Sequence, residues 1–236
     1  MFIGHFAVGL ASKRFAPKAS LAPLLAAPLL ADLLWPIFLL LGWERVQINP
    51  RGPNPFFTLT FISYPWSHSL LMGVTWGSLF GGAYYLLTRY RAGAWVIALA
   101  VLSHWVLDVV THVPDMPLLP TSPTLVGLGL WRSVPGTVVV ESAMFVSGVW
   151  FYTTATKPRD AIGRYGWWGL VLLSAVFYIG SLSGSAPATV AGAQDVQAFR
   201  RTLMPELLER FSKAVSLSDF RDEEFARNII EIRELL

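Results

Sequence analysis

Residues 93–113 read GAWVIALAVLSHWVLDVVTHV, and this run decides the fold class of the chain. It is long enough to cross a bilayer, which needs about 20 apolar residues. It nevertheless contains His104, Asp108 and His112, and Pro114 ends it. Ionisable side chains inside an apolar span are costly unless they are paired, so each is a candidate functional residue. We therefore predict a membrane-spanning helix that carries a polar site.

Four further runs share this apolar character, at about residues 20–42, 68–88, 134–154 and 166–185. Residues 1–12 are apolar but too short to span a bilayer unaided, which indicates a half-helix or an interfacial helix. Proline-rich stretches at residues 49–55 and 114–123 mark loops. The expected fold is an all-α, polytopic membrane bundle with about five spans and a short N-terminal helix.

Charge divides the chain into a body and a tail. Charged residues make up 14% of the chain, against roughly 25% in soluble domains. Residues 1–190 hold 11 Lys and Arg and 6 Asp and Glu, whereas residues 191–236 hold 7 and 9. We expect a membrane-embedded body over residues 1–190 and a charged tail of amphipathic helices over residues 191–236. The tail is expected to pack on the body or on a partner, and it is where a homo-oligomer would form.

The basic residues of the body flank the apolar runs, as in juxtamembrane loops. They gather in three loops, at Lys13, Arg14 and Lys18, at Arg89 and Arg91, and at Lys157, Arg159 and Arg164. The opposite loops hold Arg45, Arg51 and Arg132. Short loops rich in Lys and Arg stay in the cytoplasm, so we predict a cytoplasmic N-terminus. A nucleic-acid partner is not expected, because the basic residues form no single stripe.

His104, Asp108 and His112 follow one another at intervals of four residues. On a helix each such step advances about 40° around the axis and about 6 Å along it, so the three side chains form one stripe. Neighbours four residues apart can share a metal ion, and Asp108 can bridge one ion held with His104 and a second held with His112. The alternative is a hydrogen-bonded polar stripe that faces other helices, with Asp108 orienting a neutral imidazole.

Four more ionisable groups lie in or beside the apolar runs, namely His5, Asp32, His68 and Glu141. A lone histidine in such a place is usually structural, but a cluster of ionisable groups in a small membrane body indicates a common site. The chain has no cysteine, so a thiolate metal site is excluded.

Four short motifs follow one another in order along the first half of the chain. They are GHFAVG at residues 4–9, AAPLLAD at residues 26–32, SHS at residues 67–69 and SHWVLDVVTH at residues 103–112. In order and spacing, residues 1–130 resemble the family of predicted membrane-bound metal-dependent hydrolases, also called LexA-binding inner-membrane-associated hydrolases. The order of histidine and aspartate is also similar to the metal-ligand order of zinc-dependent bacterial phospholipases C.

This resemblance implies a metal-ligand set of His5, Asp32, His68, His104, Asp108 and His112, with Glu141 as a weaker candidate. It also implies an integral protein of the prokaryotic cytoplasmic (inner) membrane. The sequence departs from the two patterns at single positions. Leu33 follows Asp32 where family members often carry a second acid, and Thr137 stands where the phospholipases have a histidine before their last glutamate.

Ligands that are all nitrogen and oxygen suit zinc, and also manganese or iron. Such an ion lowers the pKa of bound water to about 7, and Asp32 or Glu141 would take a proton as the water attacks. A cavity beside lipid headgroups favours a phosphoester or acyl bond in a lipid-like or other small-molecule substrate. We therefore predict a metal-dependent membrane hydrolase.

Two other functions would use the same residues. A transporter of metal ions or protons would use the polar stripe as a relay, and a non-catalytic assembly protein would use it to lock helices together. The three hypotheses differ in geometry. An enzyme requires the candidate ligands to converge, a relay requires a chain of them across the membrane, and a lock requires a local partner for each histidine.

Overall fold

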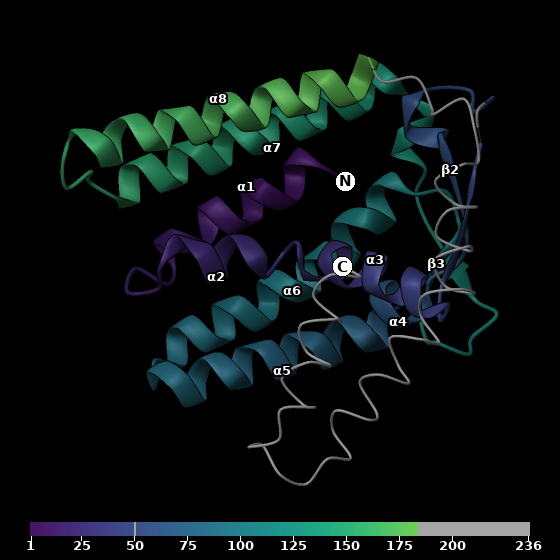
Figure 1. Cartoon of the computed structure of the whole chain (residues 1–236), viewed down its shortest axis with the longest axis horizontal. Coiled ribbons are helices and arrows are strands. Elements are labelled where there is room, and N and C mark those ends of the chain that lie inside the picture. Colours follow the sequence, from purple (N-terminus) through teal and green to yellow (C-terminus); the bar gives the residue numbers. More distant parts are fainter. Residues whose placement is uncertain (50, 184–236) are drawn as a thin grey trace, which may run out of the picture. The chain divides into compact units, whose positions relative to one another are not determined.

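The computed structural model describes residues 1–49 and 51–183, and Figure 1 shows how their elements are arranged. The protein is mostly helical, as the sequence predicts. Within residues 1–49 and 51–183, four helices are long and apolar enough to cross a membrane: α5 (Leu70–Thr88), α6 (Arg91–Thr111), α7 (Val134–Ala155) and α8 (Ala161–Ser183). They correspond to four of the five predicted spans. The amphipathic tail predicted at residues 191–236 lies outside the described residues.

The predicted first span, residues 20–42, is not one continuous helix. It forms α2 (Leu21–Ala26) and α3 (Leu30–Leu41), and neither reaches the length that a bilayer requires. The break falls at Pro28, which has no N–H to continue the helical hydrogen bonds. Pro36 lies inside α3 without ending it. The expectation of a single helix here was therefore wrong.

The predicted short N-terminal helix is α1 (Ile3–Ala11), which the 3₁₀ turn η1 (Ser12–Arg14) follows. α1 packs against α7, and Ile3 and Leu10 share a buried apolar cluster with Phe145 of α7. Gly148 of α7 allows this close approach. A β-carbon at Gly148 would lie 2.6 Å from the carbonyl oxygen of Ala7, so a larger residue there would push the two helices apart.

α5 and α6 form an antiparallel hairpin with close backbone contacts (Figure 1). Small residues make this approach possible, because a β-carbon at Gly77 or Gly81 would lie 2.7 Å from a carbonyl oxygen of α6. The opposite face of α6 packs on the broken span, where Ile97 and Val101 join a cluster with Leu24. This packing brings the loop at Pro28 against the C-terminal half of α6.

The loops that the prolines predict contain two short antiparallel hairpins. One joins β1 (Arg45–Ile48) to β2 (Leu59–Ser63), and the other joins β3 (Met116–Pro117) to β4 (Leu125–Val126). Short helical turns complete them: η2 (Pro55–Phe57), α4 (Pro65–His68) and η3 (Leu130–Arg132). α4, which ends at His68, packs against α3, α5 and β3, and the ring of His68 lies 5.0 Å from the ring of His104 in α6.

The turns that carry most of the basic residues lie together. Figure 1 shows the turn between α1 and α2, the turn between α5 and α6 and the turn between α7 and α8 at one end of the helices, at the left. The labelled strands β2 and β3 lie at the other end. The bundle therefore has one basic end, as the charge pattern of the three loops predicts, and an opposite end that carries the hairpins.

Candidate metal centre

Five of the predicted ligands come together from four separate elements. They are His5 of α1, Asp32 of α3, His68 at the end of α4, and His104 and Asp108 of α6. Two overlapping groups have ligand atoms within 4.8 Å of one another: His5, Asp32 and His104, and His68, His104 and Asp108. All five are buried except Asp32, whose side chain is 47% exposed. Such buried groups can hold a metal ion.

His104 belongs to both groups, and its two ring nitrogens have different surroundings. Nδ1 lies 2.7 Å from the carbonyl oxygen of Pro28, which can only accept, so Nδ1 carries the proton. In the neutral ring, the lone pair is then on Nε2. It lies 2.9 Å from Asp108 Oδ2 and 3.8 Å from Asp32 Oδ1, yet it is buried without a hydrogen-bond partner among the described residues. A metal ion would satisfy it.

His68 faces the same space from the opposite side. Its Nε2 lies 3.6 Å from Asp32 Oδ1 and 3.8 Å from Asp108 Oδ2. These separations are longer than hydrogen bonds. Two ligands about 2.1 Å from one tetrahedral ion lie about 3.4 Å apart, so the observed spacing is close to what a shared ion requires.

His68 is held through Ser67, which belongs to the SHS motif, by Glu44, which the sequence patterns did not identify. Glu44 is buried and accepts hydrogen bonds from the backbone N–H groups of Trp66, at 2.8 Å, and of Ser67, at 2.7 Å. The Ser67 hydroxyl lies 2.7 Å from Glu44 Oε2 and 2.6 Å from His68 Nδ1. Burial raises the pKa of Glu44, and the donors around it act in the opposite sense.

This chain of contacts sets the tautomer of His68. An ionised Glu44 can only accept, so the Ser67 hydroxyl donates to it and accepts the Nδ1–H of His68. The Nε2 lone pair of His68 then points to the carboxylates of Asp32 and Asp108. Metal-ligating histidines are commonly oriented in this way through the other ring nitrogen. The one sequence signal for it was the serine next to His68, because Glu44 lies 23 residues before Ser67.

His5 reaches the centre because α1 begins beside it. Its Nε2 lies 3.1 Å from Asp108 Oδ1, and its ring stacks on the ring of His104 with centroids 4.0 Å apart. The amino nitrogen of Met1 lies 2.5 Å from the same Asp108 oxygen. Asp108 therefore uses Oδ1 to hold α1, whereas Oδ2 faces His104 and His68.

His112 lies in neither group of potential ligands. His112 is the C-cap residue of α6, and its backbone N–H still donates to the Asp108 carbonyl oxygen at 2.7 Å, but its ring has other partners. Its Nδ1 lies 3.0 Å from Asp115 Oδ1, and Tyr64 donates to the same carboxylate at 3.0 Å. Burial and the charge of Asp115 raise the pKa of Tyr64, which keeps its hydroxyl a donor.

Glu141 is fully buried and is also outside both groups. Its Oε2 accepts the backbone N–H groups of Phe2, Ile3 and Gly4 at 3.0, 2.8 and 3.2 Å. A carboxylate at the N-terminal end of a helix satisfies N–H groups that have no partner within the helix. Glu141 therefore fixes the start of α1, which carries His5 into the centre.

The centre is closed on most sides. A void of about 10 Å³ beside His68 and His104 has room for about one water molecule. Asp32 provides the exposed edge, and its neighbours Leu33 and Ile37 are exposed as well. The centre thus opens beside an apolar surface of α3.

No family model, curated protein or solved structure matches this chain. What the protein does must be inferred from the centre itself.

Proposed function

We propose that the protein is a membrane-bound, metal-dependent hydrolase that acts on a phosphoester or acyl bond of a lipid-like substrate. One observation carries the proposal. The Nε2 atoms of His68 and His104 point into one space beside Asp108, while separate partners hold the Nδ1 atom of each ring. Two histidines oriented in this way and one carboxylate match the ligand set of catalytic zinc sites that keep an open position.

The residues fit one ion better than two. His104 belongs to both potential ligand groups but has one free nitrogen, because Nδ1 is bound to Pro28. A ring nitrogen binds one ion, so the two groups are alternative parts of one centre. We assign His68, His104 and Asp108 as the ligands, and zinc as the ion, with manganese or iron as other ions that nitrogen and oxygen ligands accept.

A divalent ion held by His68, His104 and Asp108 would lower the pKa of a bound water and polarise the oxygen of the scissile bond. Asp32 and Glu141 have different roles, because the surroundings of their carboxylates differ. Asp32 is the exposed carboxylate of the centre and has no backbone N–H donor among the described residues, so it is free to take a proton from incoming water. Glu141 is engaged by three backbone N–H groups, and we assign it to the positioning of α1.

The opening of the centre favours a lipid-like substrate. Asp32 lies next to exposed apolar residues of α3, and four helices among the described residues are long and apolar enough to cross a membrane. A substrate with an acyl chain can lie along the apolar surface while its polar bond meets Asp32. The resemblance of the sequence to membrane-bound hydrolases of the prokaryotic inner membrane is consistent with this location.

The geometry favours an enzyme over the two alternatives. A proton or ion relay needs polar groups along the whole span, whereas residues 92–102 of α6 contain no ionisable side chain. A structural lock needs a local partner for each polar atom, whereas His5 Nδ1 is buried without a hydrogen-bond partner among the described residues.

Hydrolysis by the purified full chain in detergent tests the proposal. Phosphatidylcholine and 4-nitrophenyl phosphorylcholine serve as phosphoester probes, and 4-nitrophenyl butyrate serves as an acyl ester probe. We expect the wild type to hydrolyse substrate. EDTA should abolish this activity and zinc should restore it. The Asp108→Asn variant should be inactive. Turnover that persists in Asp108→Asn, or a chain that takes up no divalent metal, would overturn the proposal.

A further inference from the structure

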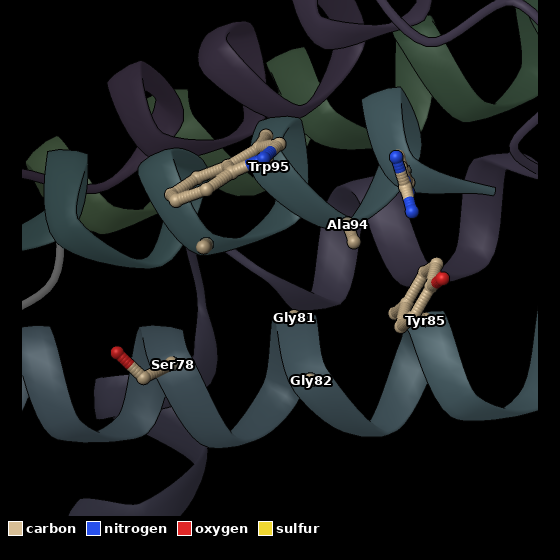
Figure 2. Close-up of a pocket in the computed structure, with 8 residues that line it drawn as sticks. Ser78, Gly81, Gly82, Tyr85, Ala94 and Trp95 are labelled. Atoms are coloured by element: carbon tan, nitrogen blue, oxygen red, sulfur yellow. The ribbon is translucent and has the colours of Figure 1, made fainter. Parts of the chain in front are cut away.

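A second hollow lies between α5 and α6 near the basic end, in the half of α6 that precedes the metal centre. Its volume is about 430 Å³. Figure 2 shows Gly81 and Gly82 of α5 and Ala94 of α6 between the rings of Trp95 and Tyr85. The hollow is therefore a groove with a floor of small residues and aromatic walls.

The groove is empty at its floor because the residues there are small. A β-carbon at Gly82 would meet no other atom within 4 Å. Trp95 is 71% exposed, and Leu86, Leu87 and Leu99 nearby on the same two helices are exposed as well. In a membrane-spanning hairpin this surface faces lipid, so an acyl chain is the material available to fill the groove.

One end of the groove is positively charged. Arg91 lines it and takes part in no ion pair among the described residues. Arg89 lies over the ring of Tyr85, with 5.8 Å from its Cζ atom to the ring centroid, and Lys18 lies over the ring of Tyr90 at 5.9 Å. Basic pockets between membrane helices bind the headgroups of anionic lipids.

We propose that this groove binds one acyl chain of an anionic phospholipid, whose phosphate contacts Arg91. The apolar walls select a lipid over free phosphate, and the guanidinium selects an anionic headgroup over a zwitterionic one. The site is separate from the metal centre and does not depend on the proposed hydrolase activity. Lipid bound here would contact both α5 and α6 at the basic end, and would stabilise the helical hairpin that carries His104.

Native mass spectrometry of the full chain in detergent tests this site. The probes are phosphatidylglycerol and phosphatidylcholine with identical acyl chains. We expect tighter binding of phosphatidylglycerol to the wild type. Arg91→Gln should weaken that binding about fivefold, the effect of about one basic residue near an anionic lipid. Gly82→Leu should weaken the binding of both lipids, because its side chain fills the groove.

Two matched variants of α8 control for general surface effects. A β-carbon at Gly166 also meets no other atom within 4 Å, and Arg164 lies near the start of α8 with its guanidinium over Tyr165. Gly166→Leu and Arg164→Gln should leave phosphatidylglycerol binding unchanged. Equal losses in these controls, no loss in Arg91→Gln, or displacement of the lipid by inorganic phosphate would overturn the proposal.

Discussion

The surroundings of His104 and of His112 differ, although the two residues belong to one motif eight positions apart. Both rings are held at Nδ1, by the carbonyl oxygen of Pro28 for His104 and by Asp115 for His112. The Nε2 atom of His104 faces the carboxylates of Asp108 and Asp32. The ring of His112 instead packs against Trp131, with centroids 4.1 Å apart.

The difference shows that an oriented imidazole is not by itself a metal ligand. His104 and Asp108 lie within α6, where residues four apart share a face, whereas His112 caps the end of the helix and its ring contacts Asp115 and Trp131. What distinguishes the two is a free nitrogen that points to carboxylates from other elements. Variants of these two regions can therefore separate a metal centre from a set of structural histidines.

Removal of each ring is expected to give the largest contrast. His104→Ala should abolish stoichiometric metal binding, because it removes the ligand that both potential groups share. His112→Ala should retain the metal. Metal analysis of both purified variants, with circular dichroism to verify their folding, measures the contrast. Equal metal content in the two variants would show that the comparison between these regions is mistaken.

Removal of the metal is expected to have the next largest effect, on the stability of the fold. A ligand whose free concentration is 100 times its Kd for the folded state stabilises that state by about 2.7 kcal/mol. EDTA should therefore lower the midpoint of thermal unfolding of the wild type, and zinc should restore it. The His112→Ala variant should respond in the same way, while His104→Ala should not respond to either reagent.

The residues behind the rings offer a finer comparison. Glu44 holds His68 through Ser67, and Asp115 holds His112 directly. Loss of such an outer partner of a ligand reduces metal affinity by about 10–100-fold. We expect this loss in Glu44→Gln and no loss in Asp115→Asn, as measured by competition with a zinc chelator. Glu44→Asp should recover part of the affinity if the carboxylate acts through Ser67.

The last prediction concerns the packing of α1, which carries His5, against α7. Gly148→Leu introduces a side chain where a β-carbon already lies 2.6 Å from the carbonyl oxygen of Ala7. Such overpacking typically costs about 1–3 kcal/mol. Gly169→Leu is the control, because a β-carbon there meets no other atom within 4 Å. Thermal unfolding of both variants should show a loss of stability in Gly148→Leu alone.

Much of the helical architecture could be predicted because apolar runs of bilayer length have few alternatives. The exception is the run at 20–42, which contains Pro23, Pro28 and Pro36. α3 continues through Pro36, whereas the chain breaks at Pro28. Composition alone does not distinguish these prolines. Where the chain breaks, the carbonyl group of Pro28 accepts a hydrogen bond from His104 of α6.

Most residues of the candidate centre could be predicted from the sequence, but the contacts that hold them in place could not. Ionisable side chains in an apolar body are conspicuous, and five of the six predicted ligands lie together. Glu44 was missed because its partners include backbone N–H groups, which no side-chain pattern reveals. The separation of His112 was missed because it depends on the contacts of its ring with Asp115 and Trp131, which the spacing of residues along one helix does not reveal.

Metal analysis of the purified wild type and of Asp108→Asn tests the central claim most directly. Each protein is incubated with one equivalent of zinc, freed of unbound ion by gel filtration, and analysed for metal per chain. We predict one zinc ion per wild-type chain and none in Asp108→Asn, with the same helical content in both. A wild type that retains no zinc, or an Asp108→Asn variant that retains as much as the wild type, would contradict the metal centre.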